Sequence, residues 1–390
     1  MANTFSMSEG LVQRAITNLK KRRQNLLDGK INSIPSPFKR FSYDFPGLEQ
    51  GVYYGITSYT KGSKTQFTLN LLFEALVYAI EHPSQLKLRV FFYNFEETDE
   101  KIMNRFQSWI LARVDKIRIS PQNLRSTRND SPLPIEILNK LESKEYKKYF
   151  DAFEESFVFS STANPTGILK ECRNYAEANG TVYKKKVEYS DTEIFDYYEP
   201  NDPTEYRIIV LDHIGIIDLE RGMNKKEAID KTSEYLAKYL RNRYGFTSIV
   251  IQQQNTSGES NDSVKLGRIR PSGAGLADST YTQKDQNVLF GLFNPYKYSL
   301  PEYMGYDIRR LKDHIRFLEV VVNRDGELGG ICPLFFDGAT CSFFEMPLPD
   351  NKAELEKVYK YAESLDKPKK VETTLFSWFK KLNIFKVKTS

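Results

Sequence analysis

The sequence predicts an α/β fold with a mostly parallel, doubly wound sheet that ends in an antiparallel C-terminal meander. Two observations carry this prediction. Five apolar, β-branched or aromatic runs are separated by segments long enough for helices, and such alternation is typical of a parallel sheet covered on both faces. Three late runs lie too close together for helices between them, so we expect them to pair antiparallel at one edge of the sheet.

The expected elements follow one another in chain order. The strands are VYYGIT (52–57), VFFYNFE (90–96), FVFSST (157–162), RIIVLD (207–212), SIVIQQQ (248–254) and NVLFGLF (287–293), followed by the meander LEVVV (318–322), CPLFF (332–336) and CSFFEM (341–346). The helices are expected at Gln66 to Ile80, Glu97 to Val114, Pro165 to Asn179 and Lys225 to Arg243. Residues 180–203 interrupt this rhythm with mixed charge and tyrosines, so we expect an inserted hairpin or loop there.

Two extensions flank the main body, which we expect to span residues 45–347. Residues 1–44 form a helical arm and linker, because Ser8 to Leu27 carries apolar residues at helical spacing and one cationic face. The KKRR run on that face is interpreted as a solvated surface in preference to a nucleic-acid patch. Residues 348–390 form a C-terminal tail, whose aromatic cluster around Trp378 either packs against the body or docks onto another protein.

Composition narrows the class of protein. Of the 390 residues, 40% are hydrophobic and 13% aromatic, and the net charge of +5 permits a polyanionic partner without requiring one. Three widely spaced cysteines argue against a disulfide framework or a C-x-x-C metal clamp and favour a reducing compartment. No apolar run approaches the roughly 18 residues of a membrane span, and the N-terminus lacks a signal-peptide pattern. We therefore predict a soluble, cytoplasmic protein that has no membrane partner.

The stretch SYTKGSKT, residues 58–65, departs by a few letters from a phosphate-binding P-loop. That motif reads G-x-x-x-x-G-K-[ST], with glycines where backbone approaches phosphate and a lysine that reaches the β and γ phosphates. Lys64 and Thr65 match it, whereas Ser63 replaces the glycine before the lysine and Gly62 lies one residue early. An expected strand precedes the stretch and a helical pattern follows it, which is the context that the motif needs.

The effect of this departure depends on the backbone before Lys64. If Ser63 needs positive φ, serine costs about 1–2 kcal/mol relative to glycine, which weakens a site without abolishing it. Alternatively, Gly62 shifts the turn by one residue. Because Thr60, Gly62 and Ser63 are small, the loop can still approach phosphate closely. We predict an atypical but functional nucleotide-binding loop made of Thr60, Gly62, Ser63, Lys64 and Thr65.

Polar side chains follow three other expected strands, at the edge where open parallel sheets bind ligands. Asp212 ends RIIVLD and can hold magnesium together with the Thr65 hydroxyl; the alternative is a helix cap or a salt-bridged aspartate. Glu96 can polarise a water that attacks the γ phosphate, while Glu97 suits the positive end of the next helix dipole. Gln253 ends SIVIQQQ and can sense the γ phosphate, unless the glutamine triplet is simply a polar edge.

These pieces occur in the order of a known family. The chain resembles the RecA-like motor domain, a P-loop NTPase fold, of DnaB-type replicative helicases, which are ring-forming ATPases that unwind duplex DNA. The resemblance runs from about Gly29 to Met346. It rests on GKINSIPSPFKRFSYDFPGLEQG, VFFYNFEETDEKIMNRF, IIVLDHIGII, VIQQQN, RIRPSGAGLADSTYTQKDQNVLFGLFNP and LEVVVNRDGELG. Each motif is weak by itself, but their order is specific.

The resemblance implies a role for each matched position. Glu96 aligns with the catalytic glutamate, Asp212 with the Walker B acid and Gln253 with the sensor glutamine. Arg324 aligns with an arginine finger that completes the site of a neighbouring subunit. The implied cofactors are ATP and Mg²⁺, with Thr65 and Asp212 as the metal-binding residues.

The resemblance also implies contacts with DNA. Arg268, Arg270 and Gly273 align with a DNA-facing loop that lines a central channel. Lys225 and Lys226, at the start of a predicted helix, can join them in holding single-strand phosphates. A solvated loop is an equally weighted alternative for these residues.

The leading hypothesis is therefore an ATP-dependent replicative DNA helicase that translocates on single-stranded DNA as a homo-oligomeric ring, expected to be a hexamer. A primase or a loader is a candidate partner. The alternatives are a recombinase-like or regulatory ATPase without unwinding, and a structural ring that holds nucleotide without turnover. Ser63, Val322 in place of the family lysine, and the lack of a match to the primase-binding N-terminal domain bear on rate and partner choice. The short form and the Asn-, Lys- and Tyr-rich composition suggest a bacteriophage protein that acts in the host cytoplasm.

Overall fold

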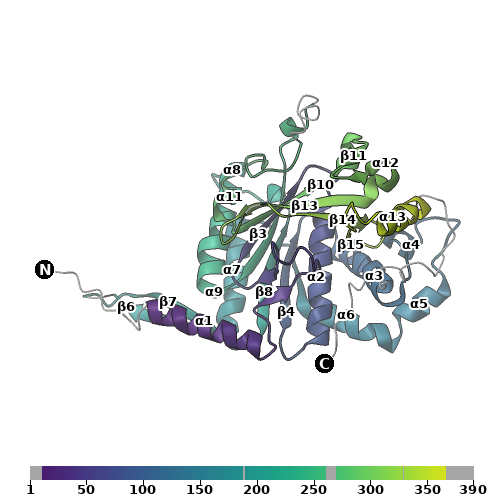
Figure 1. Cartoon of the computed structure of the whole chain (residues 1–390). Helices are drawn as coiled ribbons and strands as arrows, with labels where there is room; N and C mark the ends of the chain where they lie inside the picture. The colour runs from purple at the N-terminus through teal and green to yellow at the C-terminus, as the bar shows by residue number, and fades with distance from the viewer. Residues whose placement is uncertain (1–10, 188, 261–268, 328, 366–390) are drawn as a thin grey trace.

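A nine-stranded sheet forms the centre of the computed structural model, which describes residues 11–187, 189–260, 269–327 and 329–365. Its order is β15 (Ser342–Glu345), β14 (Ile331–Asp337), β13 (Ile315–Asn323), β10 (Val288–Phe293), β3 (Tyr53–Ser58), β9 (Thr247–Gln253), β8 (Glu205–Asp212), β4 (Lys87–Asn94), β5 (Phe157–Ser160). The strands from β10 to β5 pair in parallel. β13, β14 and β15 continue the sheet by antiparallel pairing (Figure 1). The predicted α/β fold, with its antiparallel C-terminal meander, is confirmed.

The strand register aligns the ends of the central strands. Ser58, the last residue of β3, pairs with Gln253, the last residue of β9. Asp212, the last residue of β8, pairs with Asn94 at the end of β4. The residues that follow these four strands therefore start from one edge of the sheet.

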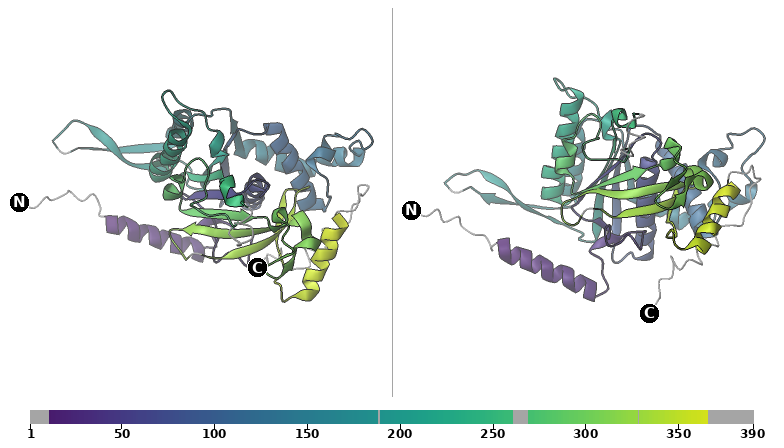
Figure 2. Two further views of the ribbon diagram at one scale, coloured as in Figure 1. Left: turned by 90° about the horizontal axis from the view of Figure 1, so that it is seen from above. Right: turned by 45° about the horizontal axis from the view of Figure 1, so that its top comes forward.

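Helices cover both faces of the sheet (Figure 2). Side chains alternate between the faces along each strand, so Phe92 of β4 belongs to one hydrophobic cluster while Phe91 and Tyr93 belong to another. The first cluster packs against α2 (Lys64–Glu81), α3 (Asp99–Asp115) and α6 (Lys144–Ser156). The second packs against α7 (Pro165–Ala178), α8 (Lys225–Glu234) and its π-helical continuation η2 (Tyr235–Arg241). The sheet is thus doubly wound, as the apolar strands predicted.

The remaining elements are short or peripheral. Within the described residues, no helix combines the length and the apolar composition needed to cross a membrane. The sequence analysis did not predict the helices between β4 and β5 that follow α3. The further elements are α4 (Pro121–Leu124), α5 (Ile135–Leu141), α9 (Asn242–Tyr244), α11 (Thr282–Asp285), α12 (Ile308–Leu311), β1 (Ser33–Pro35), β2 (Gly47–Glu49), β11 (Glu302–Tyr303), β12 (Tyr306–Asp307), η1 (Ile214–Ile216), η3 (Thr256–Glu259), η4 (Pro295–Tyr298) and η5 (Lys312–His314).

Two elements project from the same side of the body (Figures 1 and 2). The helix α1 (Leu11–Leu27) exposes Val12 and Leu19, and an ion pair of 2.7 Å joins Arg22 to Glu49 of the body. The segment predicted as a hairpin or loop is a hairpin, formed by β6 (Gly180–Lys186) and β7 (Glu193–Pro200). The division at residues 44 and 347 remains a prediction.

The first part of the predicted tail is the helix α13 (Lys352–Leu365), which packs beside α12. Val358 and Ala362 are fully buried in a cluster with Ile308 and Leu311. The aromatic cluster around Trp378 lies outside the described residues, so its packing stays a prediction.

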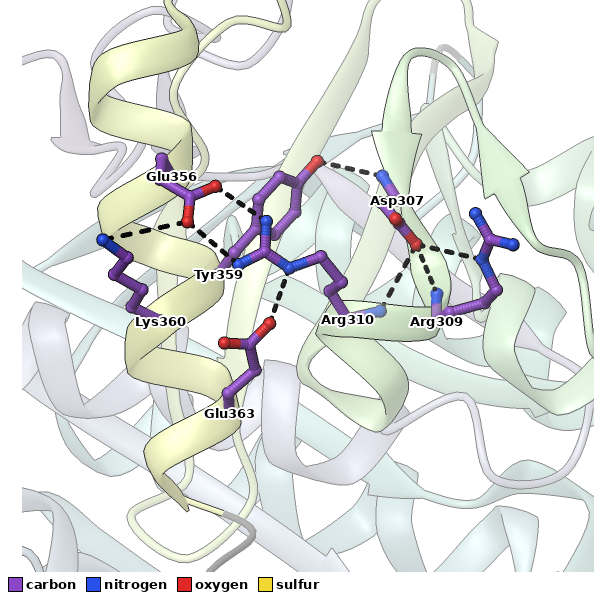
Figure 3. A network of polar contacts seen from close by, with 7 residues as sticks. All are labelled: Asp307, Arg309, Arg310, Glu356, Tyr359, Lys360 and Glu363. Carbon is purple, nitrogen blue, oxygen red and sulfur yellow. Dashed lines mark hydrogen bonds and ion pairs between the residues drawn. The ribbon is translucent and has the colours of Figure 1, made fainter.

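A polar network adds to the apolar contact between α12 and α13 (Figure 3). The guanidinium of Arg310 binds Glu356 at 2.7 Å and Glu363 at 2.6 Å. It also lies over the ring of Tyr359, with 4.6 Å between Cζ and the ring centroid. These acids raise the pKa of Arg310 through hydrogen bonds, in the order Glu356 and then Glu363.

We expect Arg310→Ala to lower the free energy of unfolding by about 0.5–1.5 kcal/mol, because two ion pairs and a cation–π contact are lost together. The neighbouring Arg309 is the matched control, since within the described part of the chain its exposed side chain pairs only with Asp307. Arg309→Ala should change stability by less than about 0.5 kcal/mol. Urea unfolding of both variants measures the difference, and equal effects would contradict the role given to the network.

Candidate functional site

A pocket of about 970 Å³ opens at the aligned strand ends. Four elements of the sheet meet there, because β3, β4, β8 and β9 all end at this edge. The pocket brings together eight of the predicted residues. They are Thr60, Gly62, Ser63, Lys64, Thr65, Glu96, Asp212 and Gln253.

The left-handed residue of the loop between β3 and α2 is Ser63, with φ 67° and ψ 33°. Gly62 is not among the residues with positive φ, so the alternative in which it shifts the turn is wrong. Gly62 is required for space instead, because a Cβ there would lie 2.1 Å from Oγ of Ser58. Ser58 occupies the position where the motif has its first glycine. The loop has thus moved one glycine and kept a strained serine at the other site.

Lys64 begins α2 and points back over the loop. Its Nζ donates to the carbonyl oxygen and to Oγ of Ser58, both at 3.3 Å. Burial lowers the pKa of Lys64 to about 8, although the charges of Asp212 and Glu96 oppose this shift. A buried ammonium of this kind gains from a nearby anion, as a phosphate would provide.

Asp212 is only 2% exposed and faces the lysine. Burial raises its pKa to about 7, and the charge of Glu96 adds to this rise. A hydrogen bond from Thr65 and the charge of Lys64 act in the opposite direction. A cation beside this carboxylate would stabilise its charged form.

The oxygen donors fit Mg²⁺. This ion commonly uses one or two protein oxygens and completes its octahedron with water and substrate phosphates. Thr65 and Asp212 offer a hydroxyl and a carboxylate that already contact each other. Among the described residues, no group of three or more acidic, histidine or cysteine side chains forms a cage for a metal. A magnesium ion here would therefore depend on water and a bound phosphate.

Two adjacent glutamates at the end of β4 are separated by their partners. The side chain of Asn94 accepts from both backbone N–H groups, at 3.2 Å for Glu96 and 3.1 Å for Glu97. Arg105 of α3 then binds Glu97 through two hydrogen bonds of 2.6 and 3.1 Å. Glu96 instead contacts Nε2 of His213 at 3.1 Å. Of the two, Glu96 is the carboxylate without a guanidinium partner among these contacts.

The glutamine triplet at the end of β9 is not a polar edge, because β9 lies between β3 and β8. Gln253 lines the pocket, with 3.3 Å between its Nε2 and Nε2 of His213. Gln252 and Gln254 are buried and turn to the segment that follows residue 268. Gln252 donates to the carbonyl oxygen of Ala277 at 2.7 Å. Gln254 donates to the carbonyl oxygen of Ser272 at 2.9 Å and accepts from its N–H at 3.1 Å.

The pocket also contains residues that the sequence analysis missed. His213 follows Asp212 directly, so its adjacency to a predicted site residue could have indicated it. Lys297 donates to Oγ1 of Thr60 at 2.9 Å and pairs with Glu259. Arg316 interrupts an apolar run at the start of β13, which is an unusual place for a buried charge. The other lining residues that were missed are Lys61, Gln66, Arg105, Asn294, Tyr296, Ser299, Asp313, Phe336 and Gly338.

The predicted arginine finger lies away from this pocket. Arg324 follows β13, and the last residue of β13, Asn323, pairs with Val288 at the start of β10. Arg324 is therefore at the opposite edge of the sheet. It is exposed, and its guanidinium donates to the carbonyl oxygen of Lys284.

The predicted DNA contacts do not line the pocket either. Arg270 is engaged by Glu319 of β13 in a two-point ion pair. Lys225 donates to the carbonyl oxygen of Ile217 at 2.9 Å, and Lys226 pairs with Asp230 at 2.6 Å. Gly273 lies against the side chain of Gln283, which a Cβ would approach to 2.4 Å. Arg268 lies outside the described residues.

Comparison with known proteins identifies the fold. No protein-family model and no curated protein sequence matches the chain. The ATPase domain of a phage helicase matches with a TM-score of 0.61 at 15% identity, over 87% of this chain and 100% of that one. A DnaB-like replicative helicase, whose structure is described with its interactions with primase, matches with a TM-score of 0.60 at 15% identity, over 87% of this chain and 68% of that one. These similarities show a RecA-like α/β fold.

We expect Gly62→Ala to destabilise the protein by about 1–3 kcal/mol, the usual cost of forcing an atom into a packed site. The added methyl group would collide with Ser58, so Ser58→Gly should relieve most of this cost in the double variant. Urea unfolding of the two single variants and the double variant measures the effect. An equal loss from Gly62→Ala with Ser58 and with Ser58→Gly would show that the collision is not its cause.

Proposed function

We propose that this protein is an ATP-dependent replicative DNA helicase that translocates on single-stranded DNA as a ring. The observation that carries the proposal is the meeting of the P-loop residues with Glu96, Asp212 and Gln253 in one pocket of a RecA-like fold. These residues are distant in sequence and come from four strand ends. Their order along the chain is that of the DnaB-type motor domain.

Phosphate binding falls to the loop and to the start of α2. The first N–H groups of a helix have no intrahelical partner, and the helix dipole favours negative charge there. Thr60, Gly62 and Ser63 shape the loop, and Lys64 supplies the ammonium. Thr65 and Asp212 would hold Mg²⁺, which neutralises charge that develops on the β and γ phosphates.

Glu96 is the proposed base that accepts a proton from the attacking water. Its carboxylate faces the pocket beside His213, whereas Glu97 is held by Arg105. Gln253 is the proposed sensor of the γ phosphate, because its amide reaches the same histidine. Glu96, His213 and Gln253 thus form a row across the pocket.

The ring is supported by the position of Arg324. This residue lies at the opposite edge of the sheet from the P-loop of its own chain. A guanidinium there is suited to stabilise transition-state charge in a neighbouring subunit. We therefore propose a homo-oligomer, with a hexamer as the expected form.

Single-stranded DNA is the proposed track. Arg268, Arg270 and Gly273, together with Lys225 and Lys226, are the proposed contacts to its phosphates. Arg270 would have to exchange Glu319 for a phosphate, since the acid now holds it. A primase is a candidate partner, because a helicase of similar fold is described with one; a loader is another.

Substitutions in the pocket test the enzyme assignment. Lys64→Ala should abolish nucleotide binding, because it removes a ground-state phosphate contact. Glu96→Gln should bind ATP but hydrolyse it about 10²- to 10⁴-fold more slowly, the range typical of a general base. Glu97→Gln is the matched control and should cost much less turnover. Equilibrium binding and ATPase assays with and without single-stranded DNA measure these effects, and normal turnover in Glu96→Gln would move the role to Glu97.

The same assays separate the alternatives. Wild-type protein that binds ATP without DNA-stimulated turnover would be a nucleotide-holding ring. DNA-stimulated turnover without unwinding of a forked substrate would indicate a recombinase-like ATPase.

A mixing experiment tests the ring. Arg324→Ala should bind nucleotide nearly normally but hydrolyse it about 10³- to 10⁵-fold more slowly, as expected for a lost arginine finger. Mixing it with Lys64→Ala subunits should restore some hydrolysis, because an intact P-loop then meets an intact finger. Arg309→Ala, another exposed arginine, serves as the control in the same mixture. Full DNA-stimulated activity of Arg324→Ala, or a monomeric active protein, would refute the ring.

A further inference from the structure

Ser63 adopts a backbone conformation that normally belongs to glycine. Its φ of 67° and ψ of 33° lie in the left-handed region, which L-residues with a Cβ occupy at a cost. Such a conformation persists where its surroundings hold it in place. Within the loop, Lys61 is also left-handed, so the loop contains strain at two positions.

Arg316 contacts the strained residue from a distant part of the chain. It lies at the start of β13, and the antiparallel pairing of β13 with β10 brings this end of the strand to the edge of the P-loop. Its Nε and Nη2 both donate to Oγ of Ser63, at 3.2 and 3.0 Å. Glycine in the usual motif position has no side chain that could accept these bonds.

The other contacts of the guanidinium fix its orientation. Nη1 donates to the carbonyl oxygens of Asp313 and Ile315, each at 2.8 Å. Nη2 also pairs with the carboxylate of Asp313 at 3.0 Å. The ring of Phe336 lies 4.6 Å from Cζ. The fork is thus held on three sides and presents its remaining donors to Ser63.

Arg316 is a buried charge that needs an explanation. The residue is 1% exposed, and burial of a guanidinium is costly unless its donors are satisfied. Burial lowers the pKa of Arg316 to about 10, and Asp313 opposes the shift. The group therefore remains a cation at neutral pH, and the serine hydroxyl satisfies donors that would otherwise be unpaired.

We propose that Arg316 is a positioning residue that holds Ser63 in the left-handed conformation, so that a serine–arginine pair replaces the glycine of the P-loop. The inference rests on the proposed use of nucleotide at this site. It explains how the loop presents its N–H groups to phosphate although the residue before the lysine carries a side chain. It also connects the P-loop to β13, the strand after which Arg324 follows.

A double-mutant cycle tests the pair. With Ser63 present, Arg316→Met should weaken binding of a fluorescent ATP analogue with Mg²⁺ by about 5- to 30-fold, because the strain at Ser63 is no longer offset. In a Ser63→Gly background, the same substitution should weaken binding by less than about threefold, since glycine adopts this φ without support. The ATPase KM should follow the affinity, whereas kcat should change less. Arg207→Met is the control, because this second buried arginine contacts Tyr198 and Tyr244 away from the pocket, and its effect should not depend on residue 63.

The cycle also separates this proposal from its rivals. An equal loss from Arg316→Met in both backgrounds would overturn it, because the arginine would then act on the nucleotide directly or on folding in general. If Arg316→Met does not fold, the comparison of Ser63→Ala with Ser63→Gly decides. Ser63→Ala loses the hydroxyl but keeps the strain, so it should bind more weakly than Ser63→Gly by at least about fivefold. Equal affinities of those two variants would refute the pair.

Failure of the proposed function would give a different result. Wild-type protein that binds no nucleotide would disprove the nucleotide site, and the pair would then be judged from thermal unfolding alone. A loss of Tm in Arg316→Met that Ser63→Gly suppresses would support the pair even then. Additive changes in Tm would contradict it, since independent sites add.

Discussion

The parallel pairing of β3, β9, β8 and β4 is the constraint on which the site depends. It places the carboxyl ends of four strands at one edge, with Ser58 beside Gln253 and Asp212 beside Asn94. Each strand end then contributes one part of the pocket within reach of the others. The antiparallel strand β13 obeys the same constraint in reverse, because its start reaches the pocket and its end lies at the opposite edge. Topology alone therefore gives Arg316 to the chain's own pocket and leaves Arg324 facing away from it.

Burial makes this pocket electrostatically incomplete. It lowers the pKa values of Lys64 and Arg316 and raises that of Asp212, because each charge has lost water. Perturbed groups that converge in a cleft are typical of functional sites. An anion beside the lysine and a cation beside the aspartate would each recover part of the lost solvation. The pocket is thus pre-organised for a pair of opposite charges, which is what a phosphate with its metal provides.

The end of β9 serves the pocket and its surroundings at once. Gln253 faces the pocket, while Gln252 and Gln254 hold the backbone of Ala277 and Ser272. A change in the position of this strand end would therefore act on both sides. The buried amides also satisfy polar backbone groups of the segment that they contact, as buried polar groups require. The same three residues join the candidate nucleotide pocket to the segment that carries Arg270 and Gly273.

The sequence by itself determined the order of strands and helices, because apolar runs and helical spacing are local properties of the chain. It also indicated Lys64, Thr65, Glu96, Asp212 and Gln253, since polar residues that directly follow buried strands must lie at the edge of the sheet. Only the tertiary structure decided which residue of the loop is left-handed, because the space at Gly62 depends on how Ser58 is turned. It also decided between Glu96 and Glu97 as the residue paired with a guanidinium, since Arg105 approaches from the next helix. The contact of Arg316 with Ser63 spans more of the chain than any local pattern covers, and it exists because strand pairing brings the start of β13 beside the P-loop.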